Sequence, residues 1–259
     1  MDRLMNSRIL VVLPTLGERQ ELLKETLESI ISQSEKPDIV IVCPKDNKQT
    51  LKLAKQVGAI VVDDPGSLSE AVNSGIEAAN ENHEFISWIG DDDLLTPDSL
   101  KTTAASLDSN PNAVLAYGYC EYIDNKGKKL FTSRAGNFAP WLMTWGPNLV
   151  PLPGILFRKS ALLKTSGFDP SLKYSMDLDM LLKLRKHGQF VNTHKTLAAF
   201  RWHSDSTTVA NRNASLKEAE YVKRRYLSPI LRPIAFLWEL PVKWATKLAA
   251  KRVNRMIVS

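Results

Sequence analysis

Short apolar runs alternate with amphipathic segments through the first third of the chain. The runs consist of β-branched and aliphatic residues, such as Ile9-Leu-Val-Val-Leu13, which is typical of strands buried on both faces. The segments between them carry apolar residues at helical spacing, and Gly58 marks the end of one of them. This pattern predicts strands at 9–13, 39–42, 59–62 and 84–89, and helices at 18–32, 47–57 and 67–80.

An alternation of strands and helices, repeated about every 25 residues, predicts an α/β fold with a mostly parallel central sheet flanked by helices. In sheets of this kind, ligands bind beyond the carboxyl ends of the strands. The polar segments that follow the predicted strands are 14–18, 44–47, 63–66 and 90–93. We therefore expect these segments to gather at one edge of the sheet and to hold the chemistry of the protein.

The second half of the chain has a less regular pattern. It predicts a helix at 97–109, a strand at 113–122 with a hairpin turn at 125–127, a helix at 177–187 and a strand near 197–202. Residues 136–153 are rich in Pro, Gly and Trp, which is typical of a substrate-facing loop. In this loop, Trp141 and Trp145 are suited either to stacking on a sugar acceptor or to packing in the core.

Composition places the chain among ordinary globular proteins. Of its 259 residues, 44% are hydrophobic and 24% are charged. Cys43 and Cys120 are too few for a disulfide framework and indicate a reducing compartment. The start of the chain is polar, unlike a signal peptide, and no apolar stretch approaches the roughly 20 residues of a membrane span. The expectation is a cytoplasmic protein.

Most of the net charge of +6 lies in the C-terminal tail. Residues 221–259 hold nine Lys and Arg residues against one acid, a formal charge of +8, whereas the remaining chain carries −2. Prolines at 229, 233 and 241 argue against a long helix up to residue 241, and the tail beyond them is predicted to be helical. One side of that helix carries a basic stripe: Lys243, Lys247, Lys251 and Arg255.

A basic amphipathic helix suits the surface of an anionic membrane. We therefore expect residues 242–259 to make peripheral contact with the inner face of the membrane. A terminal helix docked on the body of the protein, or on a partner, is the alternative. No nucleic-acid-reading module accompanies the basic residues, so no nucleic acid is expected.

Asp91, Asp92 and Asp93 directly follow an apolar strand. Three adjacent carboxylates repel one another unless a cation lies among them, and Mg²⁺ or Mn²⁺ prefers such oxygen ligands. A solvated acidic turn, or a helix cap formed by Asp93, explains the same residues without a metal. The residues by themselves leave these alternatives open.

Seven motifs, in the same order, resemble those of the GT-A-fold family 2 glycosyltransferases and together span residues 8–210. They are 9–18, 27–33, 67–76, 88–97, the paired segments 153–158 and 167–169, 176–184, and 200–207. The resemblance implies a GT-A (Rossmann-like) domain at 1–215, with a nucleotide-sugar half at 8–104 and an acceptor half at 105–215, and a helical basic tail at 216–259. It also implies an inverting, metal-dependent enzyme of polysaccharide or glycoconjugate synthesis. Such an enzyme moves a sugar from a nucleotide-diphosphate donor to a hydroxyl of a glycan or lipid-linked glycan.

Carried over residue by residue, the resemblance makes Asp177 the general base that takes the proton of the acceptor hydroxyl. Asp92, Asp93 and His203 match positions that bind Mn²⁺ or Mg²⁺. The positions that match donor nucleotide binding are Pro14, Thr15, Glu18, Asp46, Asn73, Gly75 and Asp91. The positions on the acceptor side are Asp179, Trp141, Trp145 and Arg158. Without the motif order, Asp177 and Asp179 would be interpreted as acids favoured at a helix N-terminus.

Three positions depart from the family pattern. Gly90 stands where the first Asp of the Asp-x-Asp pattern falls, Met176 where a Glu usually precedes the base, and Cys43–Asp46 where paired acids usually stand. These departures motivate a second hypothesis, a catalytically inactive glycosyltransferase-like binding or scaffold protein. A nucleotidyltransferase ranks last, because the turn at 14–18 lacks the Gly-rich, basic phosphate loop of those enzymes.

Overall fold

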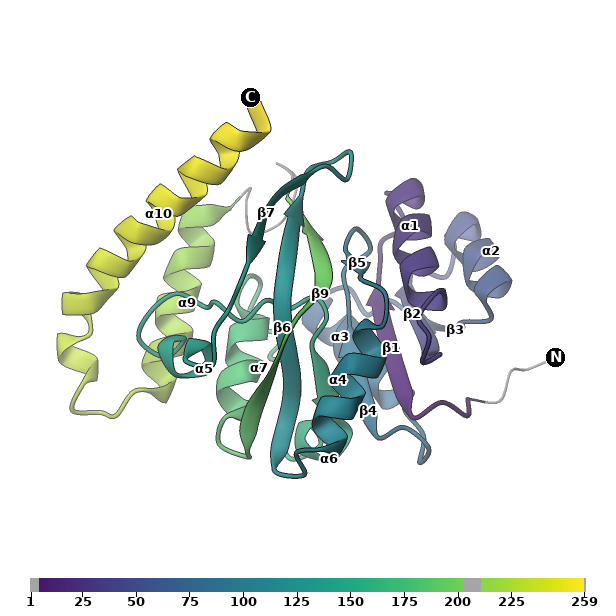
Figure 1. Cartoon of the computed structure of the whole chain (residues 1–259), viewed down its shortest axis with the longest axis horizontal. Coiled ribbons are helices and arrows are strands. Elements are labelled where there is room, and N and C mark those ends of the chain that lie inside the picture. The colour runs from purple at the N-terminus through teal and green to yellow at the C-terminus, as the bar shows by residue number, and fades with distance from the viewer. Residues whose placement is uncertain (1–4, 203–210, 259) are drawn as a thin grey trace.

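The alternation of strands and helices in the first third of the chain forms as the sequence predicts (Figure 1). The computed structural model describes residues 5–202 and 211–258. The strands are β1 (Ile9–Pro14), β2 (Asp38–Cys43), β3 (Ile60–Asp63), β4 (Phe85–Trp88), β5 (Leu94–Leu95), β6 (Ala113–Ile123), β7 (Lys129–Ser133), β8 (Leu156–Arg158) and β9 (Gln189–Arg201). The helices are α1 (Gln20–Ile31), α2 (Lys48–Val57), α3 (Leu68–Glu77), α4 (Ser99–Asp108), α5 (Ala139–Leu142), α6 (Lys159–Leu162), α7 (Met176–Leu184), α9 (Arg212–Tyr226) and α10 (Phe236–Val258), with a 3₁₀ turn at Arg232–Ile234.

The strands of the described residues form one sheet in the order β3-β2-β1-β4-β8-β6-β9-β5, with β7 paired to β6. The first four strands in this order are parallel, as the alternation predicts. The second half is mixed, because β8 runs antiparallel to both β4 and β6, whereas β6 and β9 are parallel. In Figure 1 the N-terminal α/β half lies on one side of the molecule, and α9 and α10 lie on the opposite side.

Strand β1 is buried on both faces, which explains its unbroken apolar run. Leu10 and Val12 belong to a hydrophobic cluster with residues of α3 and α7. Ile9, Val11 and Leu13 belong to a second cluster with residues of α1 and α4. The two clusters cover the two faces of the sheet and leave the strand ends for polar residues.

Local chemistry sets the ends of the helices that flank this half of the sheet. The Asn47 side chain accepts a hydrogen bond from the Thr50 N–H at the start of α2, and Gly58 ends the helix in the left-handed conformation with φ of 68°. At the start of α3, the Ser67 hydroxyl accepts from the Glu70 N–H, as a helix N-cap does, and donates to the Glu70 carboxylate. These caps were visible in the sequence as residue types and explain why the predicted boundaries of α2 and α3 are close to the observed ones.

Gly75 lets α3 pack closely on β1, and this gives a prediction about stability. A Cβ atom at position 75 would lie 2.3 Å from Val12 Cγ1. Gly75→Ala is therefore expected to destabilise the fold by about 1–3 kcal/mol through overpacking, measured as a lower urea midpoint. Because Val12→Ala removes the clashing methyl groups, the double variant is expected to lose less than the sum of the two single losses. Strict additivity of the two losses would contradict this account.

Helix α10 begins earlier than predicted, at Phe236 rather than after Pro241, and contains that proline in its second turn. Pro241 has no N–H to bond to the carbonyl of Leu237 and its ring crowds that carbonyl, so this turn is a weak point of α10. Among the described residues, no helix combines the length and the apolar character needed to cross a bilayer.

Candidate active site

The polar segments after β1 and β4 meet at one edge of the sheet, because these two strands are paired neighbours. Thr15, the first residue after β1, donates a hydrogen bond from Oγ1 to Asp91 Oδ2 at 2.5 Å. The Gly17 N–H in turn donates to Thr15 Oγ1 at 2.9 Å, and Gly17 has a φ of 71°, which favours glycine. The turn after β1 is thus fixed against the acidic end of β4.

Three aspartates follow β4, and two of them, Asp92 and Asp93, have carboxylates that converge near Gly90. Asp91 and Asp93 are buried, and Asp92 is half-buried. The Arg19 guanidinium forms ion pairs with both Asp91 and Asp92. A Cβ atom at position 90 would lie 3.1 Å from Asp92 Oδ1 and 3.4 Å from Asp93 Oδ2, so the carboxylates converge around a residue without a side chain.

The electrostatics of this cluster favour a positive charge. Burial raises the pKa of Asp91, although the hydrogen bond from Thr15 and the charge of Arg19 oppose the rise. Burial, together with the charges of Asp92 and Asp91, raises the pKa of Asp93 well above its ordinary value. Because a cation among the carboxylates stabilises their charged forms, the cluster is a place where a metal or a basic side chain is favoured.

Arg201, at the end of β9, holds the acidic turn in place and was not singled out in the sequence. Its side chain is almost fully buried, its backbone N–H donates to Asp93 Oδ1, and its Nε donates to the Asp92 carbonyl, both at 3.0 Å. The guanidinium also pairs with Glu25 of α1 at 2.7 Å. The only sequence signal for this role is its place within the motif at 200–207.

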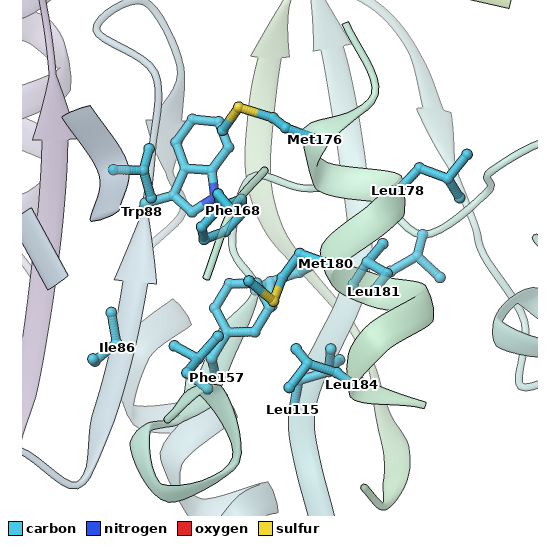
Figure 2. Close-up of a cluster of buried hydrophobic side chains, with 14 of the residues drawn as sticks. Ile86, Trp88, Leu115, Phe157, Phe168, Met176, Leu178, Met180, Leu181 and Leu184 are labelled. Carbon is cyan, nitrogen blue, oxygen red and sulfur yellow. The ribbon is translucent and has the colours of Figure 1, made fainter. Parts of the chain in front are cut away.

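Asp177 lies in the first turn of α7. The preceding residue, Met176, packs in the hydrophobic cluster that contains Trp88, the last residue of β4, and Phe168 (Figure 2). Figure 2 shows the Met176 side chain reaching the Trp88 indole, so the start of α7 lies at the carboxyl edge of the sheet. Burial is the main cause that raises the pKa of Asp177, while the backbone N–H groups of Leu178 and Asp177 oppose the rise.

Glu218 of α9 holds the segment that leads into α7. Its carboxylate accepts hydrogen bonds from three consecutive backbone N–H groups, those of Lys173 at 3.0 Å, Tyr174 at 2.5 Å and Ser175 at 2.7 Å. Its negative charge also adds to the rise in the pKa of Asp177. The sequence analysis did not find this residue, because nothing local relates positions so far apart in the chain.

Asp179, predicted on the acceptor side, has no solvent exposure. It accepts a hydrogen bond from the Tyr226 hydroxyl at 2.7 Å and lies 2.9 Å from Lys183 Nζ and 3.6 Å from the Arg225 guanidinium. These contacts join α7 to α9. In this structure the Asp179 carboxylate is therefore buried and bonded to neighbouring side chains, and it is not exposed to an acceptor.

The predicted nucleotide-binding residues divide into two groups. Glu18 and Asp46 are exposed after β1 and β2, at the same edge as Thr15 and Asp91, and Pro14 is the buried last residue of β1. Asn73 instead makes two hydrogen bonds with the backbone of Phe168, at 2.8 and 2.9 Å, which fixes the segment 167–169 against α3. Gly75 faces Val12, as described above.

The residues predicted on the acceptor side, and the predicted metal ligand His203, do not form one group in the structure. Trp141 is 62% exposed, whereas Trp145 packs edge-on against Trp238 of α10, with ring centroids 5.2 Å apart. Arg158 lies at the opposite edge of the sheet, where its guanidinium donates to the carbonyls of Leu107 and Ala113. The structure therefore does not bring Arg158 together with the acidic cluster. His203 lies outside the described residues.

The first half of the sheet has the doubly wound order β3-β2-β1-β4, with an acidic strand end at its carboxyl edge, and the second half is mixed. The family model described as "Glycosyl transferase family 2" matches residues 10–165, more than half of the chain. The chain therefore belongs to glycosyl transferase family 2.

Individual relatives extend the likeness beyond the matched residues. An uncharacterized glycosyltransferase of Rickettsia typhi is 27% identical over 216 residues, which cover 76% of this chain and 64% of that protein. An uncharacterized glycosyltransferase of Haemophilus influenzae is 20% identical over 230 residues, which cover 85% and 77%. The chain thus spans less than two thirds of the length of the Rickettsia relative.

Two solved structures share the fold. S. aureus TarS (residues 1–349) is 13% identical with a TM-score of 0.61, over 91% of this chain and 88% of that one. The mannosyltransferase PcManGT of Pyrobaculum calidifontis, solved with GDP-Man and Mn²⁺, is 16% identical with a TM-score of 0.64, over 97% and 78%. At these identities the likeness concerns the fold.

Proposed function

We propose that this protein transfers a sugar from a nucleoside-diphosphate donor to a hydroxyl of a glycan or lipid-linked glycan, with inversion at the anomeric carbon. The observation that supports the proposal is Asp177 itself, a half-buried carboxylate with a raised pKa, which follows Met176 of the hydrophobic cluster that also contains Trp88, the last residue of β4 before the segment Asp91–Asp93. One carboxylate takes the proton of the acceptor hydroxyl, the acceptor oxygen bonds to the anomeric carbon in line with the breaking bond to the nucleoside diphosphate, and this single displacement inverts the configuration. The family, and structural neighbours solved with UDP and with GDP-Man, support a nucleotide-sugar donor.

The acidic cluster suits a divalent cation, Mn²⁺ or Mg²⁺, although no three His, Cys, Asp or Glu side chains within 5–202 and 211–258 are grouped to hold one. The fit rests on the donor set: Asp92 and Asp93 offer carboxylate oxygens that converge at Gly90, and Asp92 already holds a cationic group, Arg19. When bound, the metal would stabilise the negative charge of the departing diphosphate as a Lewis acid. In this proposal His203 remains a third ligand candidate.

Other residues have supporting roles in the proposal. Thr15, Glu18 and Asp46 hold the nucleotide at the exposed edge, with Pro14 and Asp91 fixing the turn beneath it. Asn73 and Gly75 act through packing, by placing α3 and the segment 167–169 beside the donor. Trp141, which is exposed on the loop 136–153, is the side chain we propose for stacking on an acceptor sugar.

We further propose that the catalytic unit is residues 1–215, that 216–259 form a basic tail, and that the protein works in the cytoplasm at the inner face of a membrane. Both cysteines are free and buried, which suits a reducing compartment. Helix α9 crosses the boundary and contacts α7 through Glu218. A role in polysaccharide or glycoconjugate synthesis follows from a lipid-linked acceptor.

A thermal-shift screen of nucleotide sugars, with and without Mn²⁺, tests the donor. A ligand that binds the folded state at 100 times its Kd stabilises it by about 2.7 kcal/mol, so the true donor is expected to raise Tm by several degrees. We expect one nucleotide sugar to do so, and more strongly with Mn²⁺. If none binds and none is hydrolysed, the protein is better described as an inactive glycosyltransferase-like binding or scaffold protein.

A further inference from the structure

Helix α10 carries a row of large apolar side chains that face away from the body of the protein. Leu237, Leu240, Trp244 and Leu248 recur at intervals of three or four residues, so they lie along one side of the helix. Each is between 56% and 69% exposed, which is high for side chains of this size. We call these four residues the α10 stripe. In Figure 1, α10 is the yellow helix at the outer side of the molecule, beside α9.

The body of the protein holds α10 by its other side. Trp238 packs on Trp145, and the nearly buried carboxylate of Glu239 pairs with Arg224 of α9. Lys243 lies 3.6 Å from Glu220 of the same helix α9. These contacts fix the rotation of α10 and leave the stripe pointing outward, so the surface that covers the stripe is not this body.

The charges around the stripe indicate which partner it fits. Lys251 is exposed and Lys247 half-exposed, and at 100° per residue both lie on the same side of the helix as Trp244. After Glu239 the sequence has no further acid and adds Arg252 and Arg255. Two copies of so basic a surface would repel each other. A nucleic acid would match the basic residues but would leave the three leucines of the stripe unburied. Lipid headgroups with negative charge, above an acyl layer, match both features.

We infer that α10 is a docking surface for an anionic lipid bilayer, on which it lies in the interfacial plane. The three leucines enter the boundary of the acyl region, Trp244 lies at the headgroup level, and the lysines extend along the apolar surface to reach phosphates. The biological purpose of this binding rests on the proposed function, because a membrane-bound enzyme is close to a lipid-linked acceptor. Lipid binding itself does not depend on sugar transfer.

The sequence places a basic stripe on one side of a predicted tail helix that begins after Pro241, and it therefore leaves Leu237 and Leu240 out of that helix. The structure changes this arrangement, because the early start of α10 adds Leu237 and Leu240 to the side that carries Trp244 and the lysines. The outward side is therefore mixed, apolar in its first half and basic in its second.

Vesicle sedimentation with the full chain tests the inference, using phosphatidylcholine vesicles with and without phosphatidylglycerol. Wild type is expected to bind the anionic vesicles, and the Trp244→Ser/Leu248→Ser variant to bind at least about tenfold more weakly. Lys247→Gln/Lys251→Gln is expected to weaken binding to anionic vesicles by about tenfold or more and to leave binding to neutral vesicles unchanged.

Leu163→Ser is the matched control. It removes a leucine that is 69% exposed but lies outside the α10 stripe, and it is expected to bind like wild type.

Three results would overturn the inference. The first is wild-type protein that stays in the supernatant with anionic vesicles, and the second is stripe variants that sediment like wild type. The third is a dimer in light scattering that the same stripe substitutions dissociate, which would make the stripe an interface between two copies. Donor binding by thermal shift, measured on the same variants, is expected to be unchanged, so a failure of the proposed function appears separately from a failure of lipid binding.

Discussion

Replacing Asp177 by Asn is expected to lower the rate of sugar transfer by about 10²- to 10⁴-fold, the range over which a positioned general base contributes. Asparagine keeps the size of the side chain and its place at the start of α7 but cannot accept the acceptor proton. Donor binding, measured by thermal shift, is expected to stay close to wild type, since Asp177 acts on the acceptor. The rate is read as nucleoside diphosphate released from the donor.

A remote aspartate provides the control for this variant. Asp108 is at the end of α4, pairs with Arg8 at 2.6 Å at the surface, and belongs to the opposite edge of the sheet. Asp108→Asn is expected to leave the rate unchanged and to cost at most about 1 kcal/mol of stability. If Asp177→Asn keeps full activity, Asp177 is not the general base, and that assignment is wrong.

The pH dependence of the rate follows from the same carboxylate. The transfer needs Asp177 deprotonated, and burial, with the charge of Glu218 adding to it, raises its pKa. The rate is therefore expected to fall as the pH drops through this raised pKa, at a higher pH than an exposed aspartate would give. Glu218→Gln keeps an oxygen for the backbone N–H groups but removes the charge, and is expected to move this acidic limb to lower pH. Glu220→Gln, on the same helix, serves as the comparison and is expected to leave the limb in place.

Asp92→Asn is expected to weaken Mn²⁺ binding by at least about tenfold, because it removes one of the two carboxylates that converge at Gly90. Titration calorimetry of the metal alone measures this loss without any need for activity. Arg19→Gln is expected to act in the opposite direction and to strengthen Mn²⁺ binding in the absence of donor, since the guanidinium that now pairs with Asp92 competes for the same charge.

These two variants separate the possible explanations of the acidic cluster. If wild type and Arg19→Gln both fail to bind Mn²⁺, the cluster is an arginine-held turn, and the metal is not part of the function. If Asp92→Asn binds Mn²⁺ as well as wild type does, Asp92 is not a ligand. Asp108→Asn again provides the matched Asp-to-Asn control.

Much of the N-terminal half could be predicted from the sequence. Runs such as Ile9–Leu13 are apolar throughout because a parallel strand is covered on both faces, and this leaves a signal that needs no knowledge of the fold. The capping residues Asn47 and Ser67 act within three residues of themselves, so the starts of α2 and α3 were equally accessible, whereas α3 ends at Glu77, before the predicted residue 80. The place of Asp91–Asp93 at a strand end followed from the same pattern.

The second half was harder, because its elements do not repeat a local unit. Strand β8 has three residues and is inserted antiparallel between β4 and β6, so no periodicity marks it. Strand β9 begins at Gln189, earlier than the predicted strand, since its first residues are half-exposed and polar ones interrupt the apolar pattern. Helix α10 begins before Pro241, and its first turn contacts α9 through Glu239 and Arg224, a pairing that the local sequence does not reveal.

The sequence by itself determined the class of sheet, the acidic strand end and the carboxylate at the start of α7. Each of these depends on residues that are close together in the chain, so a local pattern reveals it. Only the tertiary structure decided which charges meet there. Arg19, Arg201 and Glu218 reach their partners across 43 to 176 positions of the chain, and which of many Arg and Glu residues does so depends on how the elements pack. The same holds for α10, where contacts with α9 choose the face that remains exposed, and with it the surface that we propose for the membrane.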